Sequence, residues 1–302
     1  KICIFTGTRA EYGILKPLMQ TIAADPDLNL QILASGTHLS KEFGLTVQEI
    51  QQDGFDVDEK VEILMSSDTT VGVCKSLGIG LISFSEALQR LDPEVLVVLG
   101  DRYEALAVVI TALITKVPVA HIHGGEATFG LIDEAIRHAI TKMSYYHFTS
   151  TRQYRNRVIQ LGEFPERVFN VGALGIDNIK NLALVEREEL EQMLDLPLDR
   201  DSMLITFHPV TLEEKTSATQ FEELLNALDR FPEIAKVFTK SNADAGGRQI
   251  NKMIDDYVQH HNQSVAFYSL GQTRYLNVLR HMKCIVGNSS SGIIEAPSLK
   301  VA

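Results

Sequence analysis

The chain has 302 residues, of which 45% are hydrophobic and 22% charged, a composition typical of a globular protein with room for two domains. Its formal net charge of −11 argues against broad binding to nucleic acid or to an anionic membrane, although a few arginines can still hold a small anion. Cys3, Cys74 and Cys284 form no CxxC pair and no Cys/His ligand spacing, which argues against a disulfide framework or a zinc site. No apolar run approaches the roughly 18 residues of a membrane span. We therefore expect a cytoplasmic protein with no membrane partner.

Short apolar runs alternate with segments of helical periodicity in the first half of the chain. Near-continuous apolar runs suit parallel strands that are buried on both faces. These runs are 1–5 (KICIF), 30–34 (LQILA), 94–99 (EVLVVL) and 117–122 (VPVAHI). Residues 82–91 and 103–115 between them have the spacing of amphipathic helices. The alternation predicts βαβ units and a doubly wound parallel sheet.

The same pattern begins again in the second half. The predicted strands there are 203–207, 235–239, 265–269 and 283–287, and the helices between them are 221–231, 247–259 and 273–282. We predict two Rossmann-like α/β domains, residues 1–175 and 176–302, with a hinge near residues 172–182. Residues 298–302 (SLKVA) read as the entry to a further strand. We therefore expect that the C-terminal part of the second domain is missing.

Polar residues follow the predicted strands of the first domain. In an open parallel sheet, ligands bind beyond the carboxyl ends of the strands. Arg9 follows the first strand in TGTRAEYG (6–13), where an arginine and a helix N-terminus can hold an anion. His38 follows the second strand, and Asp101 and Arg102 follow the third in GDRYEA (100–105). Each also has a structural interpretation: a solvated arginine, a structural histidine and an aspartate that caps a helix.

The stretch HIHGGEATFGLIDEAIRHAITK (121–142) has the densest chemistry of the first domain. Its Gly-Gly pair lets the backbone turn sharply and presents Glu126 near the edge of the sheet. A helix is predicted to start near Leu131, with Asp133 and Arg137 spaced i,i+4. For Asp133, helix pairing and a role in a site remain equally open.

Two other polar residues of that stretch are expected to be structural. Glu134 and His138 also stand at i,i+4, and we favour an ordinary helix contact for this pair, which contributes about 0.2–0.5 kcal/mol. His121 lies within the predicted strand and is expected to be structural as well.

In the second domain, His208 follows the strand 203–207, and SNADAGG (241–247) follows the strand 235–239. The strongest local signal is CIVGNSSSGIIEAPS (284–298), an apolar strand that enters a Ser-rich turn and a short helix. Backbone N–H groups and hydroxyls at a helix start make a phosphate cradle, while the alternative is a Ser-rich helix cap. Neither a GxGxxG nor a GK[ST] pattern is present. With the acids of the first domain, this predicts a cleft enzyme for a phosphorylated or nucleotide-linked substrate.

Six motifs in this order resemble the hydrolysing UDP-N-acetylglucosamine 2-epimerases: GTRAEYG, GDRYEA, HIHGGE…IDEAIRHAITK, FHPVT, SNADAG and GNSSSGIIEAPS. The resemblance covers essentially the whole chain. It implies the two-domain GT-B architecture, with the nucleotide mainly on the C-terminal domain. It also implies conversion of UDP-GlcNAc and water to UDP and N-acetylmannosamine for sialic acid biosynthesis, through a 2-acetamidoglucal. No metal or redox cofactor is expected, and the assembly is expected to be a homodimer or homotetramer.

The resemblance also implies roles for residues that match its motifs. The implied catalytic residues are Asp101, Glu126, Asp133, Arg137 and His208. The implied contacts to UDP or substrate are Arg9, His38, Arg102, Asn242, Ser289, Ser290, Ser291, Gly292 and Glu295. Ser290 and Ser291 are the favoured phosphate contacts, Glu295 matches the ribose contact, and His208 assists the departure of UDP. We hypothesise that Asp101 and Glu126 share abstraction of the C2 proton and that Asp133 serves the addition of water.

Several alternatives stay open. The same motifs suit a hydrolysing 2-epimerase of UDP-2,4-diacetamido-2,4,6-trideoxyglucose, in the pathway to legionaminic acid. A non-hydrolysing epimerase would release UDP-ManNAc, and a GT-B glycosyltransferase would need an acceptor. A non-catalytic nucleotide-sugar sensor would need the phosphate cradle but not the three carboxylates together.

Overall fold

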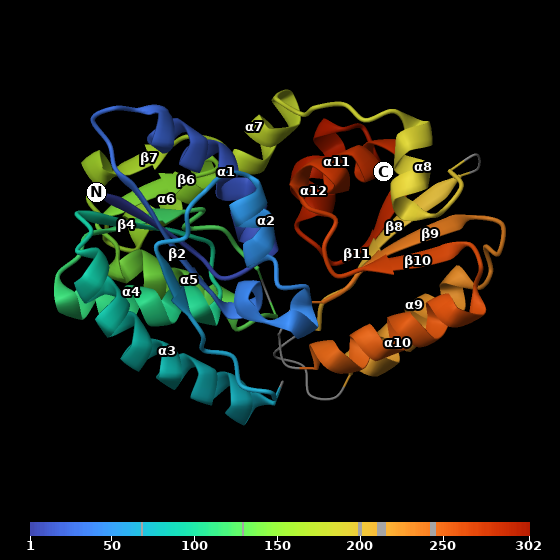
Figure 1. Ribbon diagram of the computed structural model, residues 1–302, viewed down its shortest axis with the longest axis horizontal. Coiled ribbons are helices and arrows are strands. Elements are labelled where there is room, and N and C mark those ends of the chain that lie inside the picture. The colour runs from blue at the N-terminus through green and yellow to red at the C-terminus, as the bar shows by residue number, and fades with distance from the viewer. Residues whose placement is uncertain (68, 129, 199–200, 210–215, 242–245) are drawn as a thin grey trace. The chain divides into compact units, whose positions relative to one another are not determined.

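The computed structural model describes residues 1–302 except 68, 129, 199–200, 210–215 and 242–245. The chain divides into two compact units, Lys1–Leu174 and Gly175–Ala302. Each unit has its own parallel sheet with helices on it (Figure 1). The predicted fold class, two Rossmann-like α/β units, is confirmed.

The first unit is built on a seven-stranded sheet in which every neighbouring pair is parallel. Its order is β3 (Glu59–Val61), β2 (Leu30–Ser35), β1 (Ile2–Thr6), β4 (Val95–Leu99), β5 (Val119–Ile122), β6 (Tyr146–Thr149) and β7 (Val168–Asn170). The strand order changes direction between β1 and β4, which is the position where open α/β sheets bind ligands. The four predicted strands of this half are confirmed. The sequence analysis missed β3, β6 and β7, which are three or four residues long and carry polar residues.

Helices cover both faces of this sheet. They are α1 (Arg9–Ala24), α2 (Val47–Gln52), α3 (Thr70–Leu91), α4 (Tyr103–Thr115), α5 (Asp133–Met143) and α6 (Arg152–Gln160). Short 3-10 helices occupy Gly36–Leu39, Lys41–Phe43 and Pro165–Arg167. The predicted helix near Leu131 begins two residues later, at Asp133.

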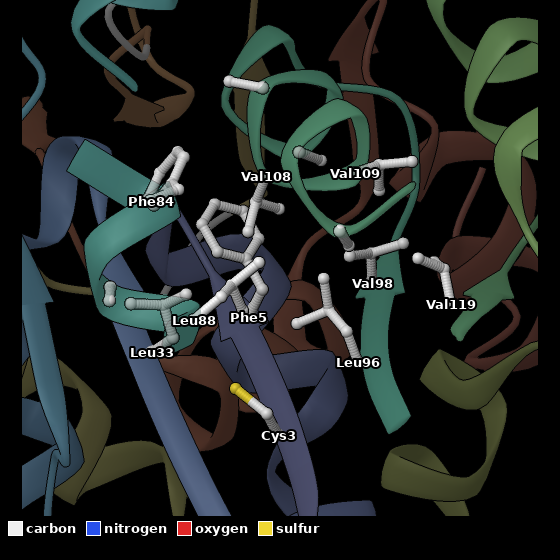
Figure 2. Packing of buried hydrophobic residues seen from close by; sticks show 14 of the residues in the cluster. Cys3, Phe5, Leu33, Phe84, Leu88, Leu96, Val98, Val108, Val109 and Val119 are labelled. Atoms are coloured by element: carbon white, nitrogen blue, oxygen red, sulfur yellow. The ribbon is translucent and has the colours of Figure 1, made fainter. Parts of the chain in front are cut away.

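Alternate strand residues feed two separate cores. Cys3 and Phe5 of β1 point to the side of α3 and α4, where Phe84, Leu88 and Val108 pack against them (Figure 2). The residue between them, Ile4, joins the other core with Tyr12 and Leu15 of α1. Because side chains alternate along a strand, a strand with helices on both faces must be apolar at every position. This explains the near-continuous apolar runs.

Helix α3 (Thr70–Leu91) is long enough and apolar enough to cross a membrane, judged by length and composition only. The sequence analysis had expected no segment of that kind. The core helix of a soluble protein passes the same test. The core that lies between the sheet and helices α3 and α4 contains four residues of this helix, Phe84, Ala87, Leu88 and Leu91.

The second unit has a four-stranded parallel sheet. Its order is β10 (Ser264–Phe267), β9 (Ala235–Thr239), β8 (Ser202–Thr206) and β11 (Cys284–Gly287). The helices are α7 (Leu174–Lys180), α8 (Arg187–Leu194), α9 (Ser217–Leu228), α10 (Gly247–His260), α11 (Gln272–His281) and α12 (Ser291–Ser298). All four strands predicted for this half are confirmed. After α12, the carbonyl of Ala302 accepts a hydrogen bond of 2.8 Å from the Ile285 amide of β11.

Candidate functional site

The loop after β1 is closed by a carboxylate that the sequence analysis did not select. Glu11 accepts hydrogen bonds from the amides of Gly7 (2.7 Å) and Thr8 (3.1 Å), while the Thr8 hydroxyl caps helix α1. These two amides precede α1, and Arg9, which was expected to hold an anion together with the helix N-terminus, is the first residue of α1. Burial raises the pKa of Glu11 to about 7, against the lowering effect of Arg102.

Arg102, at the start of α4, is paired with a buried carboxylate. Its guanidinium lies 3.2 and 3.3 Å from the two carboxylate oxygens of Glu104, whose side chain is fully buried. A buried carboxylate is stable only when it is paired, so the two residues act as one unit. After Glu11, Glu104 is the second buried acid that the sequence analysis did not select. Its partner Arg102 stands two positions away, and residues at that spacing are not expected to face each other on a helix.

Arg137 of α5 lies at the centre of the polar residues in the first unit. It is 4% exposed, and its two terminal nitrogens reach four groups. One donates to the Asp101 carboxylate and to the Thr128 hydroxyl (2.8 Å), and the other to the carbonyl of Glu126 (2.9 Å) and to Glu134 (3.2 Å). The predicted role of Arg137 in orienting carboxylates thus has a geometric basis in its contact with Asp101. These contacts go beyond the i,i+4 spacing to Asp133 from which the sequence analysis started.

Asp101 is held where its charge is partly desolvated. Its side chain is 21% exposed, and burial raises its pKa, outweighing the lowering by the guanidiniums of Arg137 and Arg102. A carboxylate with a raised pKa is a stronger base than an exposed one. This is the electrostatic setting expected of a group that takes a proton.

Glu126 is held through one oxygen, Oε1. The Ser150 hydroxyl donates to that oxygen at 2.6 Å, and the ring nitrogen Nδ1 of His123 lies 3.5 Å from it. The amide of Leu174 donates to the other ring nitrogen of His123 at 3.4 Å, which leaves the proton of the neutral ring on Nδ1, facing Glu126. Burial lowers the pKa of His123, against the attraction of Glu126, so the neutral form is favoured.

The backbone around this loop is held in conformations that few residues adopt. His123 has a φ of 65°, uncommon for a residue with a side chain and typical of functional sites. Gly125 has a φ of 79°, and a Cβ there would lie 2.6 Å from the carbonyl oxygen of Tyr154. The predicted sharp turn at Gly-Gly is therefore real, and it also allows a close backbone approach. The signal that could have selected His123 was its position directly before that turn.

Two other histidines are structural. His121 donates to the carbonyl of Gly100 at 2.7 Å and lies 3.1 Å from the Thr141 hydroxyl, and burial lowers its pKa to about 3. The ring nitrogens of His38 lie 2.9 and 2.8 Å from the hydroxyls of Thr6 and Thr46, and burial lowers its pKa to about 4. His38 is fully buried, so its ring lies inside the unit and not at an exposed edge where a substrate contact was expected.

Asp133 is the first residue of α5 and is partly buried. A carboxylate at a helix N-terminus is favoured by the helix dipole. Four positions later Arg137 binds Asp101, so one helix start brings Asp133 to the same sheet edge as Asp101. Contacts in the structure thus join Asp101, Glu126 and Arg137, while Asp133 lies on the same helix as Arg137 and Arg102 is adjacent to Asp101 in sequence.

In the second unit, the end of β11 is clamped to the end of β8. Asn288 accepts a hydrogen bond from the His208 amide and donates one to the His208 carbonyl, both at 2.8 Å. The Cβ of any other residue at Gly287 would lie 1.8 Å from the carbonyl oxygen of Thr206, so the two strand ends meet too closely for a side chain. Asn288, which the sequence analysis left out, thus holds the backbone of His208.

The serine loop only partly matches the predicted cradle. The amides of Ser291 and Gly292 bond back to Ser289, to its hydroxyl (3.3 Å) and carbonyl (3.1 Å) respectively. Within the described part of the chain, the amides of Ser289 and Ser290 have no acceptor in the protein, and Ser290 is exposed. Ser291 is buried and accepts a bond of 2.7 Å from the Tyr275 hydroxyl, so Ser289 and Ser290 are better placed for a phosphate than Ser291.

Glu295 of α12 is 7% exposed, and burial raises its pKa against the lowering effect of Ser291. A Cβ at Gly175 would lie 2.6 Å from a Glu295 carboxylate oxygen, so this glycine leaves room for the acid. Asn242 lies outside the described residues. The remaining candidates thus form two groups, each placed by loops at the carboxyl edge of one sheet.

Comparison with known proteins indicates the family of the chain. A family model described as UDP-N-acetylglucosamine 2-epimerase matches residues 20–302. The chain is 43% identical, over 99% of its length, to the GDP/UDP-N,N'-diacetylbacillosamine 2-epimerase (hydrolyzing) of Campylobacter jejuni, of which it covers 78%. It is 39% identical, over its full length, to the polysialic acid biosynthesis protein P7 of Escherichia coli, of which it covers 77%. It is 31% identical, over 98% of its length, to the UDP-N-acetylglucosamine 2-epimerase of Neisseria meningitidis serogroup B, of which it covers 77%.

Solved structures share the fold. The UDP-GlcNAc 2-epimerase from Neisseria meningitidis bound to UDP-GlcNAc matches 99% of this chain, and 80% of its own, with a TM-score of 0.80 at 18% identity. The two parallel-sheet units are those of the GT-B epimerases. The family match over most of the chain, together with relatives above 30% identity, shows that this protein belongs to the UDP-N-acetylglucosamine 2-epimerase family.

Proposed function

We propose that this protein is a hydrolysing 2-epimerase that acts on a UDP-linked 2-acetamido sugar. A carboxylate removes the C2 proton while the bond from C1 to the UDP oxygen breaks, which gives a 2-acetamidoglucal and UDP. Water then adds its hydroxyl group to C1, and a proton returns to C2 from the opposite face. The product is the free sugar with C2 inverted. The observation that carries the proposal is the pairing of partly buried Asp101 with Arg137, beside the held carboxylate of Glu126.

We assign proton abstraction to Asp101 and Glu126 and the addition step to Asp133. The C2 proton is weakly acidic, so the base must be positioned and desolvated. The raised pKa of Asp101 favours that role. In Glu126, Ser150 and His123 occupy Oε1, which leaves Oε2 as the oxygen that meets substrate.

The second unit is proposed to hold and release UDP. His208 would assist the departure of the diphosphate, and its backbone is held for this by Asn288. The amides of Ser289 and Ser290 suit phosphate oxygens, and Gly292 is proposed to belong to the same loop at the start of α12. Glu295 would bind the ribose hydroxyls. In the first unit, Arg9 and Arg102 are proposed to contact the substrate.

The sugar is assigned from the relatives. The relative at 43% identity is named for N,N'-diacetylbacillosamine, whereas the relative named for UDP-N-acetylglucosamine is 31% identical. We therefore place the 2,4-diacetamido-2,4,6-trideoxy sugar first and GlcNAc second. With GlcNAc the products would be N-acetylmannosamine and UDP, which enter sialic acid biosynthesis, and the similarity to a polysialic acid biosynthesis protein supports keeping this candidate.

The test is turnover in D2O followed by NMR. The protein is incubated separately with UDP-GlcNAc, UDP-diacetylbacillosamine and GDP-diacetylbacillosamine. We expect a free sugar that is inverted at C2, carries deuterium there, and appears together with free nucleotide. A product that keeps its nucleotide, or no turnover of either UDP-linked substrate, would contradict the proposal.

We further propose that the reaction needs no metal or redox cofactor, and that the enzyme is a cytoplasmic homodimer or homotetramer. Elimination and hydration change no oxidation state overall, and the arginines can stabilise the departing diphosphate. Activity that survives dialysis against EDTA is the expected result, and light scattering measures the assembly.

A further inference from the structure

We propose that Glu134 is a positioning residue for the reaction proposed above, and not a simple helix contact. Its spacing from His138 had suggested an ordinary i,i+4 pair. That contact exists, with 3.2 Å between Glu134 Oε1 and His138 Nε2. The other oxygen, Oε2, makes contacts that the spacing could not reveal.

Glu134 Oε2 binds the loop that carries Glu126. It accepts a hydrogen bond of 2.5 Å from the amide of Thr128 and one of 3.2 Å from Arg137. Arg137 in turn donates to the Thr128 hydroxyl (2.8 Å) and to the carbonyl of Glu126 (2.9 Å). Residues 126–128 are therefore held at three points by two side chains of α5.

The same contact sets the orientation of Arg137 toward Asp101. Arg137 is almost fully buried, and its planar guanidinium can face two carboxylates only in one rotation. Glu134 takes one end of the guanidinium and Asp101 takes the other. Removing the charge of Glu134 removes one of the two carboxylates that hold the Arg137 guanidinium in this rotation.

The electrostatics agree with an ionised Glu134. Partial burial raises its pKa, but the Thr128 amide, Arg137 and His138 together outweigh this effect, so the pKa is lowered. An ionised carboxylate accepts hydrogen bonds from all three groups and donates to none. Glu134 is therefore suited to act through fixed acceptor geometry.

The experiment compares steady-state kinetics of Glu134→Gln, Glu134→Asp and His138→Gln with the wild type. Glutamine keeps the size but loses the charge, and aspartate keeps the charge but withdraws it by one methylene. We expect kcat to fall about 10- to 100-fold in Glu134→Gln, since misplacement by about 1 Å costs on that order, while KM changes less than about threefold. Glu134→Asp should lie between this variant and the wild type. The control His138→Gln removes only the outer contact and should stay within about threefold of the wild type.

Hydrogen exchange of the Thr128 amide, measured without substrate, separates this inference from the proposed function. Faster exchange in Glu134→Gln than in His138→Gln is the expected result. If the wild type turns over a sugar but Glu134→Gln keeps its kcat, the inference is wrong. If the wild type turns over neither UDP-linked substrate, the proposed function is wrong, and unchanged exchange in Glu134→Gln then overturns the positioning role as well.

Discussion

At the scale of single residues, the environment of each carboxylate decides its chemistry. Asp101 and Glu126 follow neighbouring parallel strands, and both are partly shielded from solvent. Arg137 binds the side chain of Asp101 but only the backbone of Glu126, so the two acids are held in different ways. This difference between Asp101 and Glu126 cannot be read from the residue types, because both are ordinary acids in the sequence.

We expect Asp101→Asn and Glu126→Gln to lose proton abstraction. Each amide keeps the shape of the acid but cannot accept the C2 proton, and general base catalysis contributes typically 10²- to 10⁴-fold. The rate of deuterium entry at C2, followed by NMR, should fall by about that factor in each variant. Undiminished exchange in one of them would remove that residue from the role of base.

The buried histidines predict a loss of stability in acid. His121 has a pKa of about 3 and His38 of about 4 in the folded state, against an ordinary value near 6.5. Below pH 6.5 the unfolded chain binds more protons at these positions, so the free energy of unfolding falls as the pH drops toward 4. Urea unfolding at pH 7, 5.5 and 4.5 measures this slope. His121→Asn, which cannot titrate, should show a shallower slope than the wild type, and an unchanged slope would contradict the assignment.

At the scale of elements, the function depends on how strands end. Each candidate group sits where a parallel strand gives way to a loop or helix, because all carboxyl ends of a parallel sheet meet at one edge. The turn after β11 shows the constraint most sharply, since Gly287 passes against the backbone of Thr206 and Asn288 then binds His208. We therefore expect substitutions in such turns to displace the backbone that positions the candidate residues.

Gly287→Ala should destabilise the second unit severely. Its φ is 138°, and the added Cβ would overlap the Thr206 carbonyl, so the strand end must move. We expect a loss of about 3 kcal/mol or more in the free energy of unfolding, measured with denaturant. Gly292→Ala is the matched control, because its Cβ would meet only Ile285 at 3.6 Å within a helix. A similar loss in both variants would contradict the steric explanation.

At the scale of the whole molecule, the two units supply different halves of the proposed chemistry. Acids and an arginine gather in Lys1–Leu174, while the serine loop and His208 belong to Gly175–Ala302. A ligand that binds only the folded protein stabilises it by mass action. UDP should therefore raise the stability of the protein.

We expect UDP at 100 times its dissociation constant to add about 2.7 kcal/mol to the free energy of unfolding. The melting temperature, followed by calorimetry with and without UDP, checks this. Uridine is the control, because it lacks the diphosphate that the serine loop is proposed to hold. Equal stabilisation by UDP and uridine would contradict a phosphate contact at Ser289 and Ser290.

Much of the fold was predictable from the sequence, and the site only in part. The near-continuous apolar runs at β1, β2, β4 and β5 indicate buried parallel strands, because helices cover both faces of the sheet. Short strands such as β3 and β7 show no such apolar run. Motif order indicated Asp101, Glu126 and Arg137. It did not indicate His123, Ser150 or Asn288, whose roles arise from contacts with residues that are not their helix neighbours.

The sequence by itself determined the long buried strands, the fold class and the family, because periodicity and motif order are properties of the chain. Only the tertiary structure decided which polar groups meet. Arg137 finds Asp101 36 positions away, and Glu134 binds the Thr128 amide in addition to His138. The tertiary structure also buries His38 and Ser291, and each forms a hydrogen bond within the protein. Hydrogen bonds depend on distance and direction in space, and spacing along a helix accounts for those quantities only within one or two turns.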